Sequence, residues 1–168
     1  MNKDVETIAI VPGSFDPITY GHIELVKQAL QKYDRVYLAV MINSKKEYLF
    51  TLEERTAIAQ AALADLERVT VISSEGMLWQ LAEELHATGI VKGYRNERDL
   101  AYEQEMAAFN LAHNPHAPTE LLPAPAALSE LSSTVVRERI HRGFSLAGYL
   151  PPNAEALIGK IISERGSF

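Results

Sequence analysis

Four short segments of the sequence carry side chains suited to binding phosphate groups. In chain order these segments hold Ser14 and His22, Lys45 and Lys46, Lys92 and Arg95, and the run Ser132-Ser133-Thr134. Lysine and arginine bring positive charge to a phosphate, while histidine and hydroxyl groups form hydrogen bonds with its oxygens. The 168-residue chain has no cysteine, which excludes disulfides, thiolate metal sites and a cysteine nucleophile. These residue types predict a site for a phosphate-bearing ligand.

The first of these segments, residues 13–22, lies where a buried strand is expected to pass into a helix. The preceding residues 7–11 are apolar and β-branched, as expected of a strand buried on both faces of a parallel sheet. Gly13 permits a tight turn after the strand, and His22 lies at the start of the helix. Because a helix N-terminus offers free N–H groups and the positive end of a dipole, we expect Ser14 and His22 to flank an anion pocket.

Strand-like and helix-like segments alternate along the chain. Strands are expected at residues 7–11, 35–42, 69–72, 89–91 and 120–122. Helices are expected from residue 22, from residue 51, over 77–87, over 100–112, from residue 132 and after residues 149–153. Thr51 and Glu54 form a capping box at one helix start, and Asp99 is placed to cap another.

This alternation predicts an α/β fold: a doubly wound, Rossmann-like parallel sheet with helices on both faces, followed by C-terminal helices. The chain shows no internal repeat and no linker, so residues 1–168 are expected to form a single domain. Ligands of such folds bind at the carboxyl ends of the strands. Since all four phosphate-compatible segments follow predicted strands, we expect them to meet at this edge of the sheet.

The composition excludes several kinds of partner. The net charge of −6 argues against broad binding to nucleic acid or to an anionic membrane surface, because both require a basic face. The longest apolar runs, such as residues 36–42, are too short to span a bilayer, and residues 1–4 do not begin a signal peptide. We therefore expect a cytoplasmic protein with no nucleic-acid and no membrane partner.

Read together, the motifs resemble the phosphopantetheine adenylyltransferase family of the nucleotidylyltransferase superfamily. Residues 13–22 match the superfamily signature T/S-F-D-x-x-x-x-G-H. The family's lysine loop, its R-G-x-R-N-x-x-D-x-x-Y-E segment, its S-S-S-x-V-K/R-E element and its C-terminal turn are matched by residues 44–55, 92–103, 132–138 and 149–153. The resemblance covers nearly the whole chain and implies a single nucleotidylyltransferase domain.

The resemblance implies that AMP is transferred from ATP to 4'-phosphopantetheine, giving dephospho-coenzyme A and pyrophosphate. The displacement would be direct and in line, without a covalent intermediate, with Mg²⁺ carried by ATP rather than by a protein metal site. The attacking phosphate is already largely ionised near neutral pH, so no general base is needed. Catalysis would rest on alignment and on stabilising the charge that develops around the α-phosphorus. The family also implies a homohexamer.

Roles for individual residues follow from the same resemblance. His22 would contact the ATP phosphates and stabilise the transition state, while Ser14 would lie between nucleotide and acceptor. Lys46, rather than Lys45, aligns with the lysine that bridges the acceptor phosphate and the α-phosphate, although the sequence leaves the choice between the two open. The implied catalytic residues are His22, Lys46, Ser14 and Arg95. The implied ATP-binding residues are Ser14, Phe15, His22, Gly93, Tyr94, Arg95, Glu103, Leu128, Ser129, Glu130, Leu131, Ser132, Ser133 and Thr134, and the implied acceptor-binding residues are Ser14, Lys46, Leu78 and Lys92.

Some residues depart from the family pattern. Lys92 stands where the family has arginine, which would replace a two-point grip on the acceptor phosphate by a point charge. Leu128 and Glu130 stand where aromatic residues are usual. Two alternatives therefore stay open: a nicotinate- or nicotinamide-mononucleotide adenylyltransferase, whose motifs residues 13–17 and 131–137 also resemble, and an inactive nucleotide-binding regulator.

Overall fold

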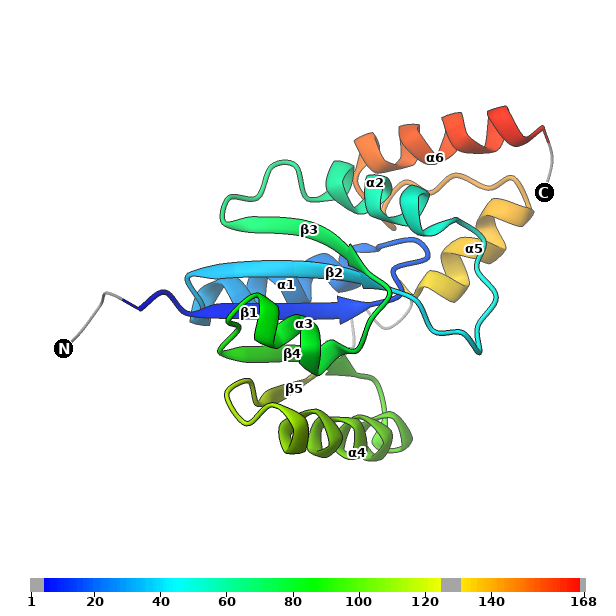
Figure 1. Ribbon diagram of the computed structural model, residues 1–168. Coiled ribbons are helices and arrows are strands. Elements are labelled where there is room, and N and C mark those ends of the chain that lie inside the picture. Colours follow the sequence, from blue (N-terminus) through cyan, green and yellow to red (C-terminus); the bar gives the residue numbers. More distant parts are fainter. Residues whose placement is uncertain (1–4, 125–130, 167–168) are drawn as a thin grey trace.

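The fold is built around one parallel sheet. The computed structural model describes residues 5–124 and 131–166. Within them, five strands lie in the order β3-β2-β1-β4-β5, and all neighbours are parallel (Figure 1). Their bounds are β1 Ile8–Gly13, β2 Arg35–Met41, β3 Val69–Ser74, β4 Gly89–Tyr94 and β5 Thr119–Pro123. This order reverses direction at β1 and confirms the predicted doubly wound sheet.

Helices cover both faces of the sheet, as predicted. Their bounds are α1 Tyr20–Lys32, α2 Leu52–Ala62, α3 Leu78–Glu84, α4 Glu97–His113, α5 Ser133–His141 and α6 Pro152–Arg165. Successive residues of the central strand β1 point to opposite faces. Ala9 and Val11 pack into the core cluster that includes α1, whereas Ile10 packs into a second cluster with residues of α3. In Figure 1, α1 and α3 accordingly lie on opposite sides of β1.

The capping box predicted for α2 is present. The Glu54 N–H donates to Thr51 Oγ1 at 3.1 Å, and the Thr51 N–H donates to Glu54 Oε1 at 2.9 Å. Two backbone donors at the helix start are thereby satisfied. No helix within the described ranges is both long and apolar enough to cross a bilayer.

Two predicted boundaries near β4 were wrong. The strand continues to Tyr94 instead of ending at Val91, because residues 90–94 pair in register with 119–123 of β5. Helix α4 begins at Glu97 rather than Leu100, and Asn96 caps it in place of Asp99. The Asp99 N–H donates to Asn96 Oδ1 at 2.9 Å, so Asp99 lies in the first turn of the helix. These shifts place Lys92 and Gly93 on a strand, not in a loop.

Candidate functional site

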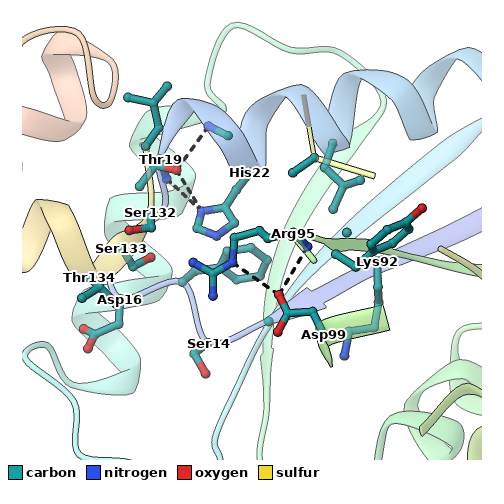
Figure 2. A pocket seen from close by; sticks show the side chains of 18 of the residues that line it. Ser14, Asp16, Thr19, His22, Lys92, Arg95, Asp99, Ser132, Ser133 and Thr134 are labelled. Atoms are coloured by element: carbon teal, nitrogen blue, oxygen red, sulfur yellow. Dashed lines mark hydrogen bonds and ion pairs between the residues drawn. The ribbon is translucent and has the colours of Figure 1, made fainter. Parts of the chain in front are cut away.

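The four phosphate-compatible segments meet at a cavity of about 660 Å³ at the carboxyl ends of β1 and β4. Figure 2 shows side chains from the first, third and fourth of these segments, among them Ser14, Arg95 and Ser132. The segments come from the turn after β1, the loop after β2, the end of β4, and the start of α5. The predicted site residues that line it are Ser14, Phe15, His22, Lys46, Lys92, Gly93, Tyr94, Arg95, Glu103, Leu131, Ser132, Ser133 and Thr134. Their roles toward ligands stay predictions, but their proximity is a property of the fold.

Other predicted positions lie elsewhere. Leu78 is not among the residues that line the cavity and packs against the core cluster under α3. Lys45 does not line the cavity, whereas Lys46 does. Leu128, Ser129 and Glu130, for which the resemblance predicts contacts with ATP, lie outside the described residues.

His22 is held by its own helix start. The Thr19 N–H donates to His22 Nδ1 at 3.0 Å, and the ring meets Phe15 edge-on with 5.0 Å between centroids. A backbone N–H can only donate, so Nδ1 is the acceptor and Nε2 carries the hydrogen. Burial of the ring, and to a smaller degree the Arg95 guanidinium, lower the pKa of His22 to about 4. At neutral pH His22 therefore presents an uncharged Nε2–H donor to a ligand.

The start of α1 differs from the expectation of free N–H groups. The Tyr20 N–H donates to the Tyr149 carbonyl at 2.9 Å, and the Gly21 N–H donates to Thr19 Oγ1 at 3.2 Å. Since these donors are used inside the protein, the helix contributes its dipole and the His22 ring, not these two N–H groups.

The turn after β1 has a strained backbone. Phe15 has φ 48° although it is not glycine, and its ring lies against Gly13, where an added Cβ would come within 2.9 Å of Phe15 Cζ. Gly13 therefore provides the space that the Phe15 ring occupies. Phe15 in turn contacts His22, so Gly13 shapes the site indirectly.

The loop after β2 presents Lys46 through a turn built on Asn43. The Lys46 N–H donates to the Asn43 carbonyl at 3.0 Å, and the Lys45 N–H donates to Asn43 Oδ1 at 3.0 Å. Tyr48 Oη accepts the Asn43 N–H at 2.7 Å and lies 3.3 Å from Ser14 Oγ. This contact joins the lysine loop to the turn after β1.

Lys92 and Glu103, assigned to separate ligands by resemblance, form an ion pair. Lys92 Nζ lies 2.9 Å from Glu103 Oε1 and 2.6 Å from Oε2, and the Glu103 side chain is 10% exposed. Arg95 has a weaker, exposed partner, with 3.4 Å between its Nε and Asp99 Oδ2. An exposed pair of this kind holds its cation loosely, so Arg95 can turn toward a ligand.

The start of α5 closes the cavity from the other side. Ser132 Oγ accepts the Val135 N–H at 3.2 Å as the N-cap, and Ser133 Oγ donates to the Pro17 carbonyl at 2.7 Å. Arg137 Nη1 donates to the Asp16 carbonyl at 2.9 Å. These bonds fix the hydroxyl run against the turn after β1.

Sequence reasoning gave no site role to Asp16 or Tyr48, and of Arg137 it noted only that the position resembles one near the nucleotide in the family. Arg137 and Tyr48 line the cavity, and Asp16 accepts the N–H groups of Leu49 and Phe50 at 2.9 and 3.0 Å. Asp16 and Arg137 lie within motifs quoted above, so the motif itself carried the signal. Tyr48 had no such signal, because its role depends on a contact with Ser14 across the fold.

Comparison with known proteins gives consistent matches. Residues 10–139 match the family model described as Cytidylyltransferase-like. Phosphopantetheine adenylyltransferase of Lactobacillus acidophilus is 41% identical, with 92% of this chain and 96% of the relative covered. The proteins of that name from Lactobacillus helveticus and Psychromonas ingrahamii are both 40% identical, covering 94% and 85% of this chain and 98% and 89% of the relatives.

Proposed function

The chain belongs to the cytidylyltransferase-like family and, within it, to the phosphopantetheine adenylyltransferases, and from this membership we propose that it transfers AMP from ATP to 4'-phosphopantetheine. The chain is thus an enzyme of the nucleotidyltransferase class. The proposed products are dephospho-coenzyme A and pyrophosphate. The relatives favour this acceptor over the mononucleotides that the sequence motifs left open.

One observation carries the proposal. A single cavity brings together the side chains of Lys46, Lys92 and Arg95 and the uncharged Nε2–H of His22. Three cations and a donor suit a site that takes two polyanions, and the proposed reaction needs no protein nucleophile.

The proposed chemistry is a single displacement. An oxygen of the acceptor phosphate forms a bond to the α-phosphorus of ATP while the bond from that phosphorus to the bridging oxygen breaks, and pyrophosphate leaves with the electron pair. Lys46 would bridge the acceptor phosphate and the α-phosphate, Arg95 would hold the β- and γ-phosphates, and His22 would donate to oxygens on which charge develops. Lys92 would have to turn from Glu103 to reach the acceptor phosphate.

We also propose that Mg²⁺ enters with ATP, bound by the phosphates. In residues 5–124 and 131–166, no group of three or more His, Cys, Asp or Glu side chains is placed to hold a metal ion. What the cation supplies when bound is charge neutralisation on the triphosphate. A cytoplasmic location and a homohexameric assembly remain proposals from the family.

The test is an assay of pyrophosphate release with Mg²⁺ and ATP and each acceptor in turn. We expect release with 4'-phosphopantetheine and none with nicotinate or nicotinamide mononucleotide. Lys46→Ala should remove most of the activity. Lys45→Ala is the matched control, because Lys45 belongs to the same turn without lining the cavity, and it should retain the wild-type rate. Release with a mononucleotide alone, or none with any acceptor, would overturn the proposal.

A further inference from the structure

Arg55, on α2, is a buried cation that the proposed chemistry does not use. Its side chain is 1% exposed and is among the largest fully buried side chains of the described residues. None of the described Asp and Glu side chains forms an ion pair with it. Burial is the main reason that the pKa of Arg55 lies below its ordinary value. A charge in this setting is costly unless it satisfies several acceptors at once.

The guanidinium is hydrogen-bonded to carbonyl groups from three parts of the chain. Nη1 donates to the Ser14 carbonyl at 2.7 Å and to the Met41 carbonyl at 3.0 Å, and Nε donates to the Phe50 carbonyl at 3.2 Å. Ser14 directly follows β1, Met41 ends β2, and Phe50 precedes the cap of α2. The two strand ends are thereby fixed to each other and to the helix.

The same guanidinium also supports a ring of the cavity wall. The Arg55 Cζ atom lies 4.0 Å from the centroid of the Tyr48 ring. Tyr48 Oη in turn meets Ser14 Oγ at 3.3 Å and accepts the N–H of Asn43, whose carbonyl holds the turn of Lys46. Arg55 therefore contacts, directly or through Tyr48, the supports of both Ser14 and the lysine loop.

An apolar side chain would fill this volume without the cost of burying a charge. What it could not do is hold three carbonyl oxygens in a fixed arrangement, for which a planar guanidinium with several donors is suited. A charged side chain at this position is therefore explained by the need to hold the loops in place, and not by the need to fill the core.

We propose that Arg55 is a positioning residue for adenylyl transfer. It holds the Ser14 carbonyl and the Tyr48 ring so that the Tyr48 hydroxyl, which meets Ser14 and the Asn43 N–H, sets the spacing between Ser14 and Lys46. This inference rests on the proposed function, in which Ser14 lies between nucleotide and acceptor and Lys46 bridges the acceptor phosphate and the α-phosphate. Misplacement of such groups by about 1 Å lowers the rate far more than it lowers ground-state binding.

The test compares Arg55→Lys with Arg68→Lys. Arg68 also donates to three carbonyls, those of Leu30, Tyr33 and Asp34. It directly precedes β3 and so lies at the amino ends of the strands, whereas the cavity lies at their carboxyl ends. We expect Arg55→Lys to lower kcat on the order of 10- to 100-fold, with the Kd of ATP changed by less than about threefold. Arg68→Lys should keep the wild-type kcat. Thermal unfolding curves measured for both variants give the fraction folded at the assay temperature, and kcat is expressed per folded molecule.

Tyr48→Phe keeps the ring over Arg55 and removes only the hydroxyl. We expect a smaller fall in kcat, and we expect the double variant to be no slower than Arg55→Lys alone, because both changes act on one linkage. If Arg55→Lys does not fold, Tyr48→Phe still decides the matter, since a wild-type kcat in that variant overturns the proposal. A wild-type kcat per folded molecule in Arg55→Lys overturns it as well. A wild-type protein that releases no pyrophosphate with 4'-phosphopantetheine overturns the proposed function, and this inference with it.

Discussion

At the scale of single residues, His22 acts as a donor whose hydrogen is placed by the backbone. The Thr19 N–H occupies Nδ1, so the hydrogen is confined to Nε2, and the low pKa keeps the ring uncharged. An uncharged donor adds no net charge to the ground state of a bound triphosphate. In the proposed reaction, its hydrogen bond would strengthen as charge builds on the phosphate oxygens in the transition state.

His22→Ala should therefore lower kcat while leaving ATP binding almost intact. We expect a loss on the order of 100-fold in kcat, as is typical when one such donor is removed. Steady-state kinetics and calorimetric titration with ATP measure the two effects separately. A loss confined to ATP affinity would assign His22 to binding alone.

The low pKa of His22 also makes stability depend on pH. The folded-state pKa is about 4, against the ordinary value of 6.5. Between these values the unfolded chain binds the proton and the folded protein does not, so the free energy of unfolding falls as pH drops from 6.5 toward 4. The contribution is fully present above pH 6.5.

We expect the unfolding midpoint of the wild type to fall more steeply over this range than that of His22→Gln, which cannot titrate. Because both proteins share the same carboxylates, the difference between the two curves isolates the histidine. Parallel curves would contradict the assigned pKa.

Lys92 offers a test of how the acceptor is held. Its ammonium is paired with Glu103, so in the proposed role the acceptor phosphate would compete with that carboxylate. In Lys92→Arg, one edge of the guanidinium can stay with Glu103 while the other makes two parallel hydrogen bonds to phosphate. We expect a lower KM for 4'-phosphopantetheine and an almost unchanged KM for ATP. A change in the KM for ATP alone would place Lys92 in the nucleotide site.

At the scale of helices and strands, the sequence predicted best what depends on neighbouring residues. The Thr51 and Glu54 capping box is local, and the structure confirms it. The end of β4 was missed because it is decided by pairing of Gly93 with Leu122 of β5, far along the chain. Asn96 and Asp99 are both capable caps, and the helix begins after the earlier one.

The features of the site also fall into those that the sequence predicted and those that it did not. Motif spacing and the edge rule for parallel sheets predicted that Ser14, His22, Lys46 and Arg95 would lie together, and they line one cavity. The pair of Lys92 with Glu103 and the contacts of Arg55 were not predicted. They depend on side-chain distances across the fold, which the pattern of one sequence does not contain.

The cap of α2 can be tested within that helix. Thr51→Ala removes the acceptor for the Glu54 N–H and should lower the free energy of unfolding by about 1 kcal/mol. For a chain of this size the unfolding midpoint should fall by about 2–4 °C. Thr56→Ala is the control, since Thr56 lies inside the helix and its hydroxyl donates to the Leu52 carbonyl.

Alanine is the better helix former at an interior position, so the control should leave stability nearly unchanged. Equal losses in the two variants would show that the cap makes no special contribution.

At the scale of the whole molecule, the sheet has apolar clusters on both faces, yet α4 leaves apolar side chains in solvent. Phe109 and Leu111 are 41% and 42% exposed. Exposed apolar side chains that lie together are often buried in contacts between subunits, and the family resemblance implies a hexamer. We expect light scattering coupled to gel filtration to give the mass of a hexamer. A monomer mass at micromolar concentration would contradict this.

The hydrogen bond from the Tyr20 N–H to the Tyr149 carbonyl joins the start of α1 to a segment close to the end of the chain. On the ribosome, Tyr20 emerges early, and Tyr149 follows on the order of ten seconds later at common rates of translation. Until then, the Tyr20 N–H at the start of the helix that carries His22 lacks its acceptor, the Tyr149 carbonyl. Ser133, which bonds to the Pro17 carbonyl, also arrives late. We therefore expect the cavity to take its final form only after Ser133 and Tyr149 have been synthesised.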